Sequence, residues 1–327
     1  MMNPSVLPSA PSIVVSMILI TANLKNSCWR KKPSCTFEMR RGLLLAVGCF
    51  FSLTTALASP LEAVRETIDR MRRAATDVER LDAHEDLKGI WRVFLEEEPL
   101  EECLNFNAEG FEKVLAIVDG GEGKDQIRVI TWNIELADRT NRYGGFIITP
   151  EGWTELAQDD RMDNSDALDV QRRYKPEDWP GAIYYDAVVK SHKNKTVWLL
   201  LGWQGASGTT TRKVIETLSV SRGRIRFGTP DLEADGRRVK RHHLVYADGV
   251  SATIRYEPEN ERIVMDHLSP QSPELEGMFA FYGPDFTYDA FVWQKGTWVL
   301  EREVEVRDKS VGGPWLDPNP QKRRRRN

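Results

Sequence analysis

The stretch Ile127-Arg128-Val129-Ile130-Thr131-Trp132-Asn133-Ile134 marks the point at which the periodicity of the chain changes to two. Two sets of side chains alternate along it, and β-branched and aromatic residues dominate both sets. Successive side chains of a strand point to opposite faces, and such residues fit a pleated surface, so this stretch predicts a β-strand.

Further strands are predicted downstream. Connections such as Ser221-Arg222-Gly223 and Gln294-Lys295-Gly296 carry turn-forming residues and indicate antiparallel hairpins. We therefore expect a mainly β fold, with an antiparallel meander over residues 100–308. A propeller-like array, a barrel and a curled sheet all fit this spacing. The predicted strands are 127–136, 142–149, 182–190, 196–203, 211–220, 224–228, 239–247, 250–256, 262–267, 277–282, 287–293 and 297–306.

Two amphipathic helices are predicted upstream, over residues 59–99. Ser59-Pro60-Leu61-Glu62 has a capping serine, a proline at the first helical position and a glutamate three residues after the cap. An apolar stripe with spacings of three and four follows, and Pro99 ends the second helix. We expect both helices to pack on the β domain. The stripe comprises Leu61, Val64, Ile68, Met71, Ala75, Val78 and Leu81, and the second helix carries Leu87, Ile90, Trp91, Phe94 and Leu95.

A secretory signal peptide is predicted at residues 39–58. Met39-Arg40-Arg41 precedes an apolar run over 42–56, and Ala56-Leu57-Ala58 fits a cleavage site after Ala58. The run is shorter than the roughly 20 residues that a membrane-spanning helix needs, and no later stretch is apolar enough. The mature chain is thus expected to be periplasmic or extracellular without a transmembrane helix. Residues 1–38 are interpreted as a non-native upstream extension or a long n-region. Lipid attachment at Cys49 is the alternative to cleavage after Ala58.

Composition and charge narrow the function classes. The chain has 327 residues, of which 41% are hydrophobic and 29% are charged, and this excludes a collagen-like or wholly disordered protein. Residues 1–58 hold six basic residues and one acidic residue, which leaves 39 basic and 48 acidic residues in 59–327. That excess of acid argues against a nucleic-acid partner. The tail 309–327 is predicted to be disordered, and its run Lys322-Arg323-Arg324-Arg325-Arg326 could contact an anionic envelope surface.

No catalytic constellation emerges from the motifs. Asp266 and His267 are neighbours on a strand and should point to opposite faces, so they cannot pair easily with each other. By the same argument only one of His242 and His243 should face the core. Cys103 is the one cysteine of the predicted mature chain, which excludes an intramolecular disulfide, and we expect it in the core. No cofactor is expected.

The acidic stretch 156–180 could bind calcium, because carboxylates are hard oxygen ligands. Its spacing does not match the twelve-residue calcium loop, and a solvated loop is the simpler interpretation. The candidate ligands are Asp159, Asp160, Asp163, Asp166 and Asp169.

Aromatic and carboxylate side chains concentrate near Phe281-Tyr282-Gly283-Pro284-Asp285-Phe286 and near Trp179. Exposed aromatics beside carboxylates can stack on and hydrogen-bond to a sugar or a peptide, although a hairpin core with a capped turn fits the same pattern. The candidate ligand-binding residues are Trp179, Tyr184, Tyr185, Tyr282, Asp285, Tyr288 and Asp289.

Seven segments of the chain form a recognisable combination of motifs. They are residues 111–118, Arg128-Val129-Ile130-Thr131-Trp132-Asn133, Tyr143-Gly144-Gly145-Phe146-Ile147, Trp179-Pro180-Gly181-Ala182-Ile183-Tyr184-Tyr185, Leu200-Leu201-Gly202-Trp203, Thr211-Arg212-Lys213-Val214-Ile215-Glu216 and Met265-Asp266-His267-Leu268. Together they resemble a family of uncharacterised exported bacterial proteins without an assigned function. The resemblance covers most of the predicted mature chain and implies export and a β-rich domain. The basic tail and the segment before Met39 depart from the family pattern.

These observations favour an exported, non-catalytic binding or interaction protein whose partner is an envelope protein or a glycan. One alternative is a secreted hydrolase that uses carboxylates such as Asp285 and Asp289, and a further alternative is a calcium-stabilised adhesion module. The sequence gives no oligomeric state.

Overall fold

A computed structural model describes residues 59–111, 115–158, 169–205 and 208–306. The predicted upstream segment, signal peptide and basic tail lie outside these residues. Asp159, Asp160, Asp163 and Asp166 of the acidic stretch also lie outside them.

Three helices open the described chain: α2 (Pro60–Arg73), α3 (Asp77–Glu97) and α4 (Leu100–Asn105). The predicted start of the first helix is confirmed, because the Ser59 hydroxyl accepts a hydrogen bond from the Glu62 amide at 3.3 Å. The α3 helix ends before Pro99, as expected. Because α4 follows directly, the helical part extends beyond residue 99.

A new helix start interrupts the predicted apolar stripe. Thr76 and Glu79 form a capping box, in which each side chain bonds to the backbone of the other residue. This cap begins α3 and redirects the chain. As a result Val78 is 67% exposed and Leu81 36% exposed, so the prediction that they continue the buried stripe is wrong.

The strands of the described residues form three separate sheets, and every pairing among these strands is antiparallel except that of β15 with β9. The first sheet has the order β1 (Ala116–Gly120), β2 (Ile127–Glu135), β3 (Asn141–Thr149), β4 (Gly152–Ala157). The second has the order β11 (Arg241–Ala247), β7 (Thr210–Ser221), β6 (Lys195–Gly205), β5 (Ile183–His192), with β8 (Arg224–Phe227) also on β7. The third has the order β10 (Arg237–Val239), β9 (Leu232–Ala234), β15 (Thr297–Glu301), β14 (Tyr282–Gln294), β13 (Arg262–Pro270), β12 (Ile254–Glu257).

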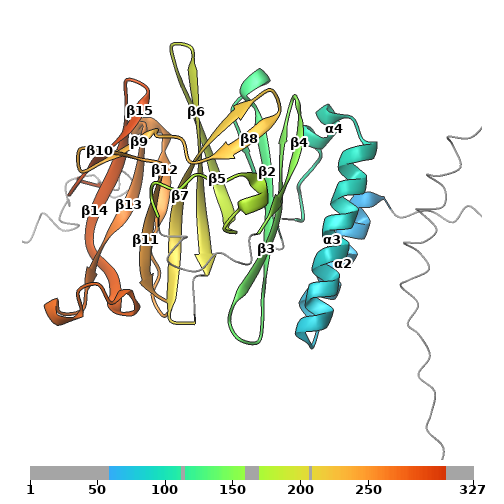
Figure 1. Cartoon of the computed structure of the whole chain (residues 1–327), viewed down its shortest axis with the longest axis horizontal. Coiled ribbons are helices and arrows are strands. Elements are labelled where there is room, and N and C mark those ends of the chain that lie inside the picture. The colour runs from blue at the N-terminus through green and yellow to red at the C-terminus, as the bar shows by residue number, and fades with distance from the viewer. Residues whose placement is uncertain (1–58, 112–114, 159–168, 206–207, 307–327) are drawn as a thin grey trace, which may run out of the picture. The chain divides into compact units, whose positions relative to one another are not determined.

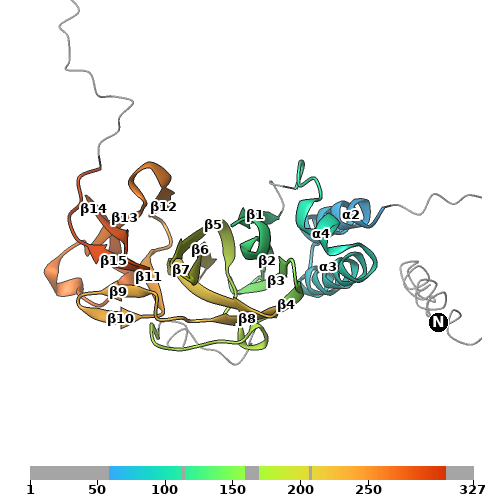
Figure 2. The same cartoon turned by 90° about the horizontal axis from the view of Figure 1, so that it is seen from above.

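The helices and the three sheets stack as successive layers (Figures 1 and 2). Alternation along each strand explains this stacking. On β3, Phe146 packs with the helices, whereas its neighbour Ile147 packs with the second sheet. On β6, Leu200 faces the first sheet and Leu201 faces the third. Strands that are apolar on both faces need cover on both sides, and stacking supplies it.

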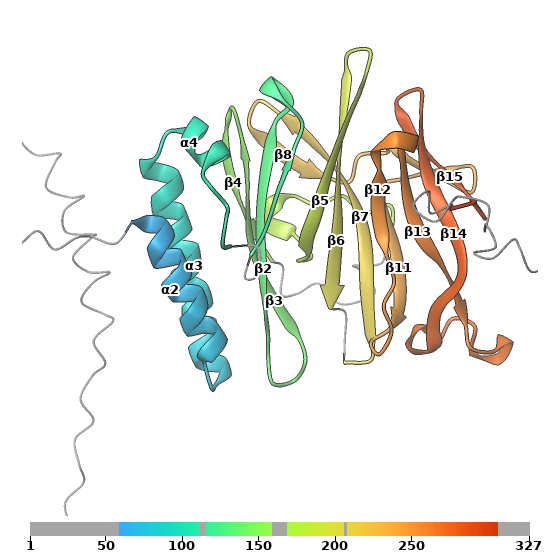
Figure 3. The ribbon, with the colours of Figure 1, turned by 180° about the vertical axis from the view of Figure 1, so that it is seen from behind.

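A mainly β, antiparallel fold with amphipathic N-terminal helices is confirmed. The barrel alternative is wrong, because the described strands form three sheets and none of these closes into a barrel (Figure 3). Four short strands were not predicted, namely β1, β4, β9 and β10. The predicted strand 277–282 instead contains a 3₁₀ turn at Phe279–Phe281, and β14 begins only at Tyr282. No helix among the described residues has both the length and the apolar character that a membrane span requires.

Candidate functional site: an aromatic bulge on β14

A bulge with three residues of β14 against one of β13 interrupts the pairing of these two strands. Asp266 pairs with Tyr288 and Leu268 pairs with Pro284, so three residues of β14 lie opposite His267 alone. Those three residues are Asp285, Phe286 and Thr287. Extra residues on one strand bend it and re-aim a side chain, and bulges are common at functional positions.

The carboxylate of Asp285 makes hydrogen-bond contacts with residues on both strands of this bulge. Asp285 Oδ2 lies 2.8 Å from His267 Nδ1 across the two strands. Asp285 Oδ1 accepts hydrogen bonds from the Thr287 amide at 3.1 Å and from its hydroxyl at 2.7 Å. Desolvation alone would raise the pKa of Asp285, but the hydrogen bonds from Thr287 and His267 outweigh it and lower that pKa. The bulge is thus held by an ionised carboxylate.

Phe286 is the residue that the bulge projects into solvent. Its side chain is 89% exposed, and its backbone has a φ of 69°, in the left-handed region. Bulky residues rarely adopt this region, and such strain costs about 1–3 kcal/mol. Exposure of a phenyl ring is also unfavourable in water. Two unfavourable features therefore coincide at one side chain.

Three more exposed apolar side chains lie in the segment that leads into β14, and Val250 lies beside that strand. The described residues include seven exposed large hydrophobic side chains, and five of them lie here. Val250 lies beside Gly283, because a Cβ built on that glycine would be 3.9 Å from the valine methyl groups. The five residues, which we call the bulge surface, are Val250, Met278, Phe279, Phe281 and Phe286.

The predicted binding residues are divided among three places. Trp179 and Tyr184 are fully buried between the first two sheets, where Trp179 Nε1 donates to the Tyr184 hydroxyl at 3.0 Å. Tyr185 lies between the second and third sheets and donates its hydroxyl to the Ile254 carbonyl at 3.0 Å. The structure therefore does not bring these three residues to the bulge surface. Their binding role stays a prediction.

The other four predicted residues lie on β14. Asp285 holds the bulge, and the Tyr282 hydroxyl accepts a hydrogen bond from the Gly277 amide at 2.9 Å. Tyr288 is half-buried opposite Asp266. Asp289 is 2% exposed and accepts hydrogen bonds from Arg302 Nη1 at 2.7 Å and from the Glu303 amide at 3.1 Å. Its charge is therefore neutralised within the protein.

His267 has a partner that the sequence did not indicate. Asp266 points away from it, as predicted, and accepts hydrogen bonds from the Thr253 amide at 2.7 Å and hydroxyl at 2.9 Å. The true partner, Asp285, is 18 positions downstream and is brought in by the bulge. Within the described residues no hydroxyl or thiol hydrogen-bonds to His267, so this pair lacks the nucleophile of a triad.

A buried ion pair lies on the face of the second sheet that looks toward the first. Arg241 Nη2 donates to Glu216 Oε2 at 2.9 Å, and the guanidinium stacks 3.9 Å from the Tyr174 ring centroid. Both charged side chains are almost fully buried. Burial raises the pKa of Glu216, and the charge of Arg241 opposes that rise. These contacts give the pair a structural role.

His242 and His243 are both half-buried, one on each face of the second sheet, so the prediction that only one faces the core is wrong. His242 packs edge-on against the Phe291 ring of the third sheet, with centroids 5.2 Å apart. His243 has both ring nitrogens buried on the opposite face. The second sheet is covered on both faces, which the sequence argument did not anticipate. Cys103 is a buried free thiol, as expected.

Metal ligands do not converge in the described part of the chain. No group of three or more His, Cys, Asp or Glu side chains there is placed to hold an ion. Asp169, the one predicted calcium ligand within it, accepts a hydrogen bond from the Gln171 amide at 2.8 Å. Calcium binding by the acidic stretch stays a prediction.

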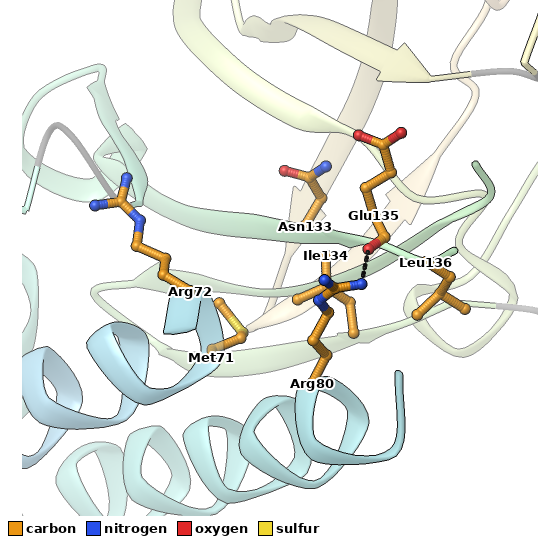
Figure 4. A pocket seen from close by; sticks show the side chains of 7 residues that line it. All are labelled: Met71, Arg72, Arg80, Asn133, Ile134, Glu135 and Leu136. Carbon is orange, nitrogen blue, oxygen red and sulfur yellow. Dashed lines mark hydrogen bonds between the residues drawn. The ribbon is translucent and has the colours of Figure 1, made fainter. Parts of the chain in front are cut away.

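A pocket of about 420 Å³ lies between the end of α2, the start of α3 and the end of β2 (Figure 4). Arg80 reaches into it and donates from Nη1 to the Glu135 carbonyl at 3.4 Å and to Asp77 Oδ1 at 3.0 Å. Asn133 Nδ2 donates to Asn141 Oδ1 at 2.7 Å. These polar groups are engaged within the protein, so the pocket is a weaker candidate than the bulge surface.

The bulge surface is the candidate site because of the exposure of its five apolar side chains and the strained backbone of Phe286. Comparisons of this chain with protein-family models, with curated proteins and with solved structures give no match.

Proposed function

We propose that this chain is an exported, non-catalytic binding protein that docks onto an envelope protein through the bulge surface. The observation that carries the proposal is Phe286, whose ring is held in solvent by a strained backbone. Strain that a hydrogen-bond network maintains is common where a side chain must meet a ligand. A protein partner would bury the ring and offset the cost of its exposure.

The chemistry of the surface favours a protein over a sugar. Its five side chains are aliphatic, thioether or phenyl groups, which offer a hydroxyl at most the weak acceptor of the Met278 sulfur. Phenylalanine and methionine are enriched in the cores of protein interfaces, and a clustered apolar surface marks such sites.

A hydrolytic role has less support at this end of the sheet. A catalytic acid needs a raised pKa, whereas hydrogen bonds lower the pKa of Asp285. Asp289 is buried and paired with Arg302. Neither carboxylate has the environment of a general acid.

Replacement of Phe286 by asparagine tests the proposal, because asparagine tolerates the left-handed backbone. We expect the variant to be as stable as the wild type or about 1 kcal/mol more stable. At the same time the binding of the envelope partner should weaken at least tenfold, since exposed aromatics are frequent hot spots. The measurements are a urea unfolding curve and, after mild crosslinking in the host and mass spectrometry, the affinity for the recovered partner.

The chain offers a matched control on α3. Val78→Ser with Leu81→Ser removes the other two exposed large hydrophobic side chains of the described residues and should leave partner binding unchanged. A partner that binds the Phe286→Asn variant as tightly as the wild type would contradict the proposal, as would equal losses in both variants.

A further inference from the structure

A second pocket, of about 640 Å³, lies where two hairpin tips of different sheets meet. The β5–β6 tip contributes Lys193 and Lys195, and the β14–β15 tip contributes Lys295. The tips are in contact, because a Cβ built on Gly296 would be 3.3 Å from the His192 side chain. Arg238 of β10 completes the wall and donates from Nη1 to Thr297 Oγ1 at 2.6 Å. The volume is within the about 300–1,000 Å³ typical of ligand sites.

Positive charge dominates this pocket, and no acidic side chain lines it. Lys195 is paired with the buried carboxylate of Asp231. Arg238 Nε lies 3.4 Å from Glu233 Oε2. Each of these two cations therefore already has a carboxylate partner within the protein.

Lys193 and Lys295 are the two cations of this pocket whose charge is not paired with a carboxylate among the described residues. Neither has a hydrogen bond or an ion pair with any other described residue, and both are exposed. Each sits at a hairpin turn with a positive φ, 55° for Lys193 and 50° for Lys295. Both unpaired lysines thus lie at turns that border the same pocket. Residues 59–327 as a whole have an excess of acidic residues. Like charges that line one pocket repel each other, and a bound anion relieves that repulsion.

We propose that this pocket binds a phosphate group that carries more than one negative charge. Lysine ammonium groups are strongly hydrated point charges and bind phosphate without a fixed fork geometry. The site is distinct from the bulge surface, and its occupancy does not depend on the proposed partner. The phosphate could belong to a free ion or to a lipid headgroup, and the two sources can be separated by experiment.

The test compares two double variants of the full chain. Lys193→Gln with Lys295→Gln removes the two unpaired charges. Arg222→Gln with Arg224→Gln removes two exposed charges from the β7–β8 hairpin, and Arg222 also has a positive φ, of 51°. Inorganic pyrophosphate is titrated calorimetrically into each protein, and co-sedimentation is measured with vesicles of phosphatidylcholine alone or mixed with phosphatidic acid, whose phosphomonoester can carry two negative charges.

The wild type and the arginine variant should bind pyrophosphate alike, and the lysine variant should bind at least tenfold more weakly, with a smaller dependence on salt. The same pattern with mixed vesicles but not with pyrophosphate assigns the phosphate to a lipid headgroup. If the wild type binds neither pyrophosphate nor the mixed vesicles, the proposal is overturned. Equal losses in both variants would also overturn it, since they would show an unspecific effect of net charge.

Discussion

Replacement of Glu216 by alanine is expected to lower the free energy of unfolding by about 3–5 kcal/mol, because it leaves a buried guanidinium without its counter-charge. The Arg241 side chain is 0% exposed and Glu216 only 3%. Nε and Nη1 of Arg241 have no hydrogen-bond partner among the described residues, so Glu216 provides its one charged contact there. Urea unfolding at neutral pH measures the loss.

Two further variants separate the charge from the packing. Glu216→Gln keeps an acceptor for Arg241 and should lose less than Glu216→Ala. The double variant Glu216→Leu with Arg241→Met removes both charges and should be nearer to the wild type than Glu216→Ala is, because no buried charge is left alone. A loss below about 1 kcal/mol for Glu216→Ala would show that water reaches this pair in solution.

Acid is expected to destabilise the protein through His84, by about 3 kcal/mol between pH 6.5 and pH 4. Burial, with a smaller contribution from Lys88, lowers the pKa of His84 from 6.5 to about 4. In this range the unfolded histidine binds a proton that the folded one does not. The stabilisation is therefore complete above pH 6.5 and is lost as the pH falls toward 4.

The contact behind this effect is specific. Nδ1 of His84 accepts a hydrogen bond from Trp132 Nε1 at 2.9 Å, so a proton on that nitrogen would abolish the acceptor. Burial also lowers the pKa of His242 to about 4, and this adds to the acid sensitivity. His84→Gln keeps an acceptor for Trp132 without a titrating group. Its unfolding free energy, measured in urea from pH 7.5 to pH 4.5, should fall less steeply than that of the wild type, and parallel curves would contradict the assignment.

Local structure was predictable where a few neighbouring residues determine it. Ser59 caps α2 as expected, and the period-two stretch from Ile127 is β2. The cap at Thr76 could also have been predicted, since Thr76-Asp77-Val78-Glu79 fits a capping box. This helix start was missed because apolar residues at helical spacing continue from one helix into the next. Periodicity therefore identified apolar positions but not every helix boundary.

Long-range arrangement was less accessible. Alternation shows which side chains of β6 are apolar, but not that two different sheets cover them. The His267–Asp285 contact depends on a bulge, and a bulge changes the register without a distinct sequence signal. The strained φ of Phe286 has the same origin. The candidate segment was therefore predictable from its aromatics, whereas its geometry was not.

The order of the strands along the chain links the second and third sheets as one folding unit. The chain leaves the second sheet after β8, forms β9 and β10 of the third sheet, and then returns to add β11 to the second. Each sheet is thus interleaved with the other in sequence, and no single cut in the backbone separates them. Neither sheet can be excised as an autonomous fragment, and a chain that stops before β15 leaves β9 and β10 without the strand that joins them to the third sheet.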